Sequence, residues 1–174
     1  MDTYSGILYF SGKTEHGLSK VTTTGAVVEV VPSSVSVEDG WADNGDGGPA
    51  INATLSCPVG IWVSAQGFIF VADALAKNVR VIEISTGLIN TVAGTGGDKF
   101  TGDGGLATSL GLGTPYGVAG YDGLLFVGDD QVFVGTQNRV RLLSVFNPSA
   151  APSFAPSIVP SNAPSVPPTS PPSA

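Results

Sequence analysis

The sequence has 174 residues, with 42% hydrophobic and 12% charged residues and a net charge of −7. This length allows one domain or two small ones, and the acidic balance argues against nucleic acid or an anionic membrane surface as a partner. A single Cys excludes an internal disulfide framework and a thiolate zinc cluster, and no apolar run approaches the ~20 residues that a spanning helix needs.

The first part of the chain predicts three short strands, at residues 6–11, 17–22 and 26–31. It begins Met1-Asp2-Thr3-Tyr4, without the basic and apolar regions of a signal peptide, so no leader is expected in the sequence as given.

Two segments then recur in the same order. Gly-Asp-Gly-Gly at 45–48 returns at 102–105, 57 residues later, and the strand Phe68–Asp73 returns at 124–129, 56 residues later. Such spacing is typical of a repeated structural unit.

The middle repeat is complete and predicts four strands: Val59–Ser64, Phe68–Asp73, Val79–Ser85 and Leu88–Gly94. The second is continuously apolar, which indicates burial on both faces. The third mixes Arg and Glu with apolar residues, so we expect it nearer the solvent. The third repeat predicts strands at 116–122, 124–129 and 139–145.

Composition changes near Asn147. Residues 148–174 contain 9 Pro among 27 residues and no charge, and the Pro residues recur every four positions. Proline prevents helix and sheet formation, so this tail is predicted to be extended and disordered, either as an O-glycosylated stalk or as an unmodified spacer. The predicted domains are therefore 1–147 and 148–174.

The repeated residues resemble the NHL repeat. The likeness rests on Gly-Asp-Gly-Gly-Pro-Ala, Leu-x-x-Pro-x-Gly-Ile, Gly-x-Ile-Phe-Val-Ala-Asp, Val-Arg-Val-Ile and Gly-Leu-Ile-x-Thr-Val-Ala-Gly-Thr-Gly, in that order. It implies an all-β fold, a partial β-propeller of four-stranded antiparallel blades. The first copy departs from the pattern, because Gly12 replaces the Asp that ends the strand, and Gly17 and Ser19 replace basic residues.

The recurring polar and glycine positions are interpreted as structural. The glycines would form turns between blades, and each strand-ending Asp would cap a turn or pair with the following Arg. These positions are Gly45, Asp46, Gly47, Gly48, Asp73, Arg80, Gly102, Asp103, Gly104, Gly105, Asp129 and Arg141.

Other motifs give little evidence of a catalytic or ligand-binding site. The Gly-x-Gly-x-x-Ala segments resemble a degenerate dinucleotide fingerprint, but that motif needs a following helix. The acidic residues near Asp43 miss the register of an EF-hand. His16, the only His, is expected to be a solvated loop residue, and Cys57 is expected to pack. No catalytic, cofactor or metal residue is therefore assigned.

Fewer than three blades do not close a ring of about six, so the chain is expected to be a fragment of a longer product or to complete a propeller by self-association. The predicted function is a non-enzymatic module that binds a protein or glycan, secreted or at the cell surface, without nucleic acid or membrane insertion. Asn52-Ala53-Thr54 is an N-glycosylation sequon, which matters only in a secreted protein. The alternative is a fragment of an NHL-like metal-dependent lyase or hydrolase whose active-site residues lie in missing blades.

Overall fold

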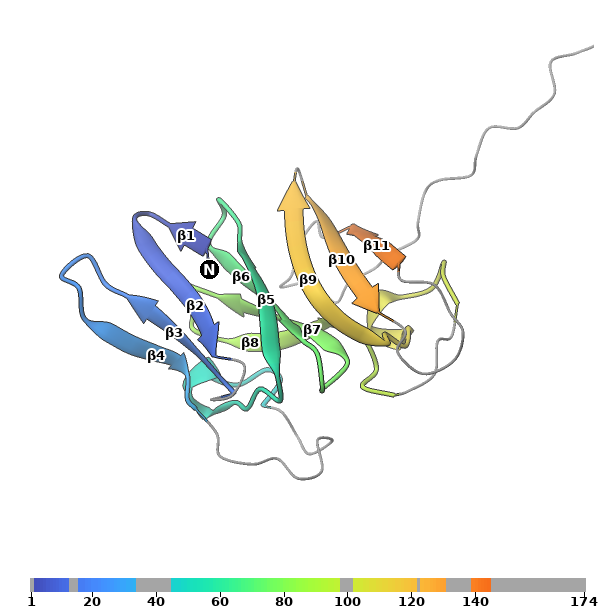
Figure 1. Cartoon of the computed structure of the whole chain (residues 1–174), viewed down its shortest axis with the longest axis horizontal. Coiled ribbons are helices and arrows are strands. Elements are labelled where there is room, and N and C mark those ends of the chain that lie inside the picture. The colour runs from blue at the N-terminus through green and yellow to red at the C-terminus, as the bar shows by residue number, and fades with distance from the viewer. Residues whose placement is uncertain are drawn as a thin grey trace, which may run out of the picture.

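The computed structural model describes residues 2–12, 16–33, 45–97, 102–121, 123–130 and 139–144. The tail and its predicted disorder lie outside these residues. The described part is all-β, as predicted, with three antiparallel sheets that stand face to face in a row (Figure 1). Its only helical residues form two 3-10 turns, η1 (Ala50–Asn52) and η2 (Ala107–Ser109). Neither turn is long enough to cross a bilayer, and the described residues include no other helix.

The first sheet has the order β1-β2-β3-β4 and differs from the expectation of three strands. Its strands are β1 (Asp2–Tyr4), β2 (Ile7–Gly12), β3 (Gly17–Val21) and β4 (Val27–Val31). The extra strand β1 pairs antiparallel with β2 across a two-residue turn at Ser5 and Gly6, both with positive φ. Such turns match the twist of the strands that they join.

The middle sheet has the order β5-β6-β7-β8. Its strands are β5 (Pro58–Val63), β6 (Phe68–Asp73), β7 (Asn78–Glu83) and β8 (Ile89–Ala93). The expectation that the third of these strands lies nearer the solvent is wrong, because Asn78 to Ile82 are all buried.

The third sheet comprises β9 (Thr114–Tyr121), β10 (Leu124–Asp130) and β11 (Arg139–Ser144), with β10 in the middle. A register shift occurs in its β9–β10 pair between Gly128 and Asp129, and a matching shift occurs in the β5–β6 pair, near Asp73. The repeat therefore extends to the irregularities of the backbone.

Two apolar layers hold the row together, one on each face of the middle sheet. Tyr9, Leu18 and Val31 of the first sheet pack with Ile69, Val71, Ile82 and Ile89 of the middle sheet. On the other face, Phe70, Val79 and Val81 pack with Leu125, Val127 and Leu143 of the third sheet. A sheet covered on both faces explains why β6 reads as a continuous apolar run.

Candidate functional site

Arg80 anchors the connection that leads from the first sheet into the middle sheet. Its side chain is fully buried, at 0% exposure, on the face of β7 that carries Ile82. Nη2 donates to Asp46 Oδ1 at 2.7 Å, and Nη1 donates to the carbonyl of Thr54 at 3.4 Å. One guanidinium thus holds two points of the connection that are eight residues apart in sequence.

Asp73, at the end of β6, holds the last part of the same connection. Its carboxylate accepts backbone N–H bonds from Ser56 at 2.8 Å and from Cys57 at 2.6 Å. Burial raises the pKa of Asp73 above its ordinary value of 3.8, while these two N–H groups and the charge of Arg80 act in the opposite direction. Burial lowers the pKa of Arg80, because it disfavours the charged form. The charge of Asp46 and its hydrogen bond to Arg80 raise this pKa.

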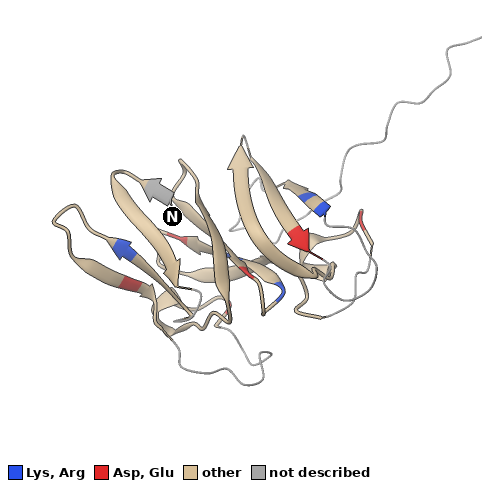
Figure 2. Cartoon of the chain, viewed as in Figure 1, with Lys and Arg blue, Asp and Glu red and all other residues tan. Residues whose placement is uncertain are grey.

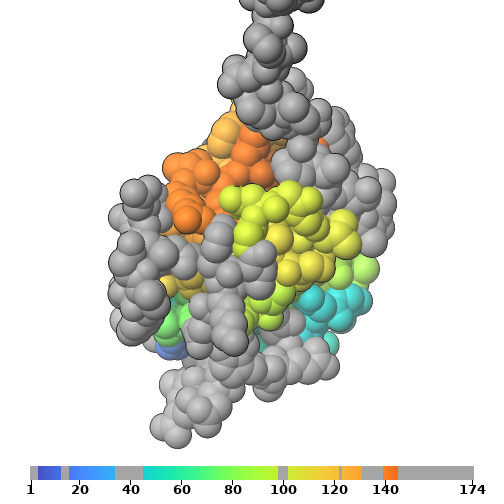
Figure 3. Space-filling model, turned by 90° about the vertical axis from the view of Figure 1, so that its right-hand side faces the viewer, coloured from blue at the N-terminus to red at the C-terminus, as the bar shows by residue number. Residues whose placement is uncertain are grey.

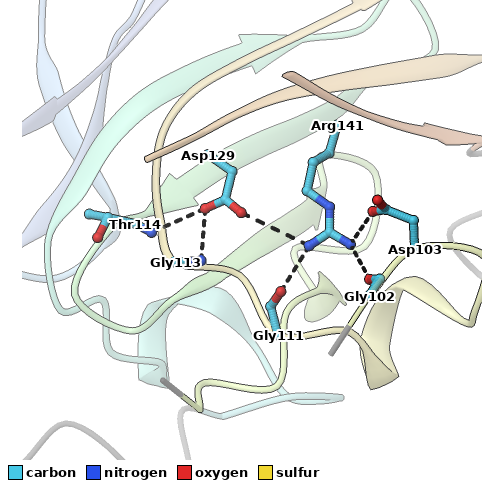
Figure 4. Close-up of polar contacts among 7 residues, drawn as sticks. All are labelled: Gly102, Asp103, Gly111, Gly113, Thr114, Asp129 and Arg141. Carbon is cyan, nitrogen blue, oxygen red and sulfur yellow. Dashed lines mark hydrogen bonds and ion pairs between the residues drawn. The ribbon is translucent and has the colours of Figure 1, made fainter. Parts of the chain in front are cut away.

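The third sheet repeats this arrangement around Arg141 (Figure 4). Its Nη1 donates to the carbonyl of Gly111 at 2.8 Å, and its Nη2 donates to Asp103 at 2.9 Å and to the carbonyl of Gly102 at 3.0 Å. Asp129 lies 3.9 Å from Nη1. We call each set of Asp, Arg and Asp a connection clamp: Asp46, Asp73 and Arg80 for the middle sheet, and Asp103, Asp129 and Arg141 for the third.

Asp129 takes the same role in the second clamp as Asp73 in the first. It accepts N–H bonds from Gly113 at 2.8 Å and from Thr114 at 3.1 Å. The backbone groups that complete the two clamps carry no residue-type signal. Only their fixed position relative to the Gly-Asp-Gly-Gly repeats could have revealed them.

The Gly-Asp-Gly-Gly segments form turns within each connection. Gly47 has φ +78° and donates to the carbonyl of Ile89, at the start of β8. Gly104, at the same place in the third repeat, has φ +91°. The three-residue turns η1 and η2 follow these segments, and such short helices cannot provide the N-terminus that a dinucleotide pyrophosphate needs.

His16 differs from its expected role as a solvated loop residue. It is half-buried, and its Nδ1 donates to the carbonyl of Ser56, next to the first clamp. His16 therefore fastens the β2–β3 turn to the connection between the sheets. Cys57, the residue after Ser56, is buried.

Within each clamp, the charged groups bond to one another and to the backbone of the connection. Among the described residues, no three His, Cys, Asp or Glu side chains gather closely enough to hold a metal ion. Asp46 and Asp103 keep 42% and 69% of their side-chain surface exposed, so the outer acidic member of each clamp is the part that solvent reaches.

Comparison with known proteins agrees with this architecture. Residues 36–102 match the family model described as the teneurin NHL domain. Residues 36–102 therefore contain NHL-type repeat sequence. The three sheets form a partial β-propeller, in which each sheet is one blade.

Two solved structures share the fold at low identity, and a third is less similar. A Bacteroides thetaiotaomicron protein of unknown function is 20% identical, with a TM-score of 0.57, over 72% of this chain and 30% of its own. An auxiliary nutrient-binding protein of the same species is 18% identical, with a TM-score of 0.52, over 71% of this chain and 32% of its own. Virginiamycin B lyase from Staphylococcus aureus is 13% identical, with a TM-score of 0.41, over 86% of this chain and 41% of its own.

The chain thus spans about a third of the length of the first two structures. No curated protein matches it in sequence.

Proposed function

We propose that the chain is a non-enzymatic NHL-repeat module that binds a protein or a glycan. The observation that carries this proposal is the internal use of the two clamps. Arg80 and Asp73 are buried and bonded to the connection that they hold, so they stabilise loops and are not presented to a substrate. The match to a teneurin NHL domain and the likeness to a protein described as nutrient-binding support the same class of function.

The recognition surface is proposed at the end of the blades where the clamps lie. The turn between β6 and β7 follows Asp73 directly and exposes 59% of Leu75. Apolar side chains on anchored loops offer rigid contact area at little cost in conformational entropy. Figure 2 shows that charged residues are sparse over the described strands, which fits a neutral or weakly charged ligand better than a polyanion.

We also propose that the module acts outside the cell, in a propeller that needs more blades than this chain supplies, from a longer chain or from a second copy. Asn52 of the sequon is exposed at the end of η1, where a glycan would project into solvent. The Pro/Ser-rich segment 148–174 would then serve as a spacer. The chain's coverage of about a third of its structural neighbours supports a larger whole.

A glycan array and a set of defined extracellular-domain proteins, probed with the purified chain, test this proposal. We expect saturable binding to one ligand class, weakened at least tenfold by Leu75→Asp and unchanged by Leu88→Thr, an exposed position in the turn at the other end of β7. In parallel, lyase and hydrolase substrate panels and elemental analysis test the enzymatic alternative. Reproducible turnover, or a stoichiometric bound metal, would refute a non-enzymatic role.

A further inference from the structure

The third sheet turns an apolar face away from the other two sheets. Its outer face carries Phe126 at 37% exposure, Leu142 at 42%, Val140 at 74% and Tyr121 at 77%. Phe126 pairs with Leu142 across β10 and β11, so these side chains form one surface. Figure 3 views this end of the molecule, with β11 in orange. Contiguous exposed apolar residues of this kind mark interaction sites.

The same positions of the middle sheet are buried between two sheets. Phe70 pairs with Val81 in β6 and β7 as Phe126 pairs with Leu142 in β10 and β11. Phe70 and Val81 are each 3% exposed, because the third sheet covers them. The outer face of the third sheet therefore continues the pattern of an interface that already exists in this chain.

The first sheet carries the complementary half at the other end of the row. Leu8, Val21 and Val27 lie side by side in the register of β2, β3 and β4. They alternate with Tyr9 and the other side chains that enter the inter-sheet core, and so lie on the opposite, outer face. Val27 is 64% exposed.

The corresponding row of the middle sheet packs against another sheet, which indicates that the outer face of the first sheet is suited to bind a sheet as well. Ile69, Ile82 and Ile89 occupy this row in β6, β7 and β8, and all three pack against the first sheet. The outer face of the first sheet therefore resembles the face of the middle sheet that packs on the first sheet. The outer face of the third sheet resembles the face of the middle sheet that packs on the third sheet.

The residues of the first sheet favour a separate molecule, rather than a blade connected to this sheet, as the partner of its outer face. In the middle sheet, Asp73 and Arg80 clamp the connection that arrives from the sheet before it. In the first sheet, Gly12 stands at the position of Asp73, and Ser19 stands at the position of Arg80. The strand pairing shows this correspondence: Gly12 pairs with Gly17 as Asp73 pairs with Asn78, and Ser19 pairs with Phe10 as Arg80 pairs with Val71. The first sheet therefore keeps the apolar row but lacks the residues that would hold an incoming connection.

We propose that two copies of this chain associate head to tail, with the outer face of the third sheet of one copy against the outer face of the first sheet of the other. The contact is heterologous, because it joins two different surfaces. Two such contacts between two copies close a ring and cover both open faces, which is how propellers avoid exposed sheet surface.

Light scattering coupled to gel filtration tests the association directly. We expect the chain, of 17.5 kDa, to elute at twice that mass. Phe126→Lys, on one face, and Val27→Lys, on the other, are each expected to give a monomer with an unchanged circular dichroism spectrum. Leu75→Lys places the same charge on an exposed loop outside both faces and is expected to leave the dimer intact.

Mixing the two monomeric variants separates this arrangement from other dimers. Each variant retains the face that its partner has lost, so one intact contact forms and the mixture yields a 1:1 complex. If Phe126→Lys does not fold, Val140→Lys, at a more exposed position of the same face, replaces it. A wild-type chain that stays monomeric at high micromolar concentration would overturn the proposal. So would a dimer whose two variants fail to associate on mixing, or open-ended growth with concentration.

Discussion

Replacing Gly120 with Ala tests a close contact between the middle and third sheets. Trp62 of β5 stacks on Phe70, with ring centroids 5.2 Å apart, and the ring of Trp62 lies directly over Gly120 of β9. A Cβ built on Gly120 would lie 2.3 Å from two carbons of that ring. The ring or the strand must move, and overpacking of this kind costs about 1–3 kcal/mol of the free energy of unfolding.

Gly117 provides a matched control on the same strand. A Cβ at Gly117 meets nothing within 4 Å, so Gly117→Ala is expected to be neutral or to stabilise by up to ~1 kcal/mol through the unfolded chain. The melting temperature of Gly120→Ala should fall by roughly 4 °C for each kcal/mol lost. Urea titrations at constant m would give the free energy differences.

A double-mutant cycle locates the cause in the tryptophan ring. With Trp62→Leu, the ring carbons that meet the new Cβ are gone, so the penalty of Gly120→Ala should drop below ~0.5 kcal/mol. Equal effects of Gly120→Ala and Gly117→Ala, or an unchanged penalty in the Trp62→Leu background, would refute this packing.

Three further predictions concern the connections and the surface. Gly60→Ala should destabilise by ~2 kcal/mol or more in urea titrations, because its Cβ would lie 2.5 Å from the carbonyl oxygen of Tyr116, and a backbone atom yields less than a ring. Arg141→Met should cost about 3–5 kcal/mol, because it removes the cation beside the buried Asp129 carboxylate and the guanidinium bonds to the connection. Asp103→Asn, at an exposed position, should cost under ~1 kcal/mol, and equal losses in chemical denaturation would contradict the clamp. Expression through a secretory pathway should add one glycan that glycosidase removes and Asn52→Gln abolishes; an unglycosylated secreted chain would argue against an accessible sequon.

The strand pattern of the repeats could be predicted from sequence because it is local. Alternation, apolar runs and glycine turns place the four strands of the middle sheet to within a few residues. Strand β1 is not predicted, because its three residues, Asp2–Tyr4, carry no apolar pattern. The adjoining Ser5-Gly6 dipeptide is the available signal, since Ser-Gly marks a turn that can join two strands.

The burial of β7 could not be predicted from its own residues. Arg80 suggests a strand near solvent, but its charge is balanced by Asp46, 34 residues earlier, and it is covered by the connection that it holds. Such a partner is set by tertiary structure. The joint recurrence of the Gly-Asp-Gly-Gly segment and the strand Arg was nevertheless visible in the repeats, and it links Arg141 to Asp103 in the same way.

The central claim is that the repeats stack face to face as blades. Nuclear Overhauser contacts between the ring protons of Trp62 and the α protons of Gly120 test it most directly, because these residues belong to different sheets and touch only if the sheets pack as described. Strong cross-peaks from the Hζ3 and Hη2 protons of Trp62 to Gly120 are predicted. A Trp62 ring that shows contacts to Phe70 within its own sheet and none to β9 would contradict the stacking.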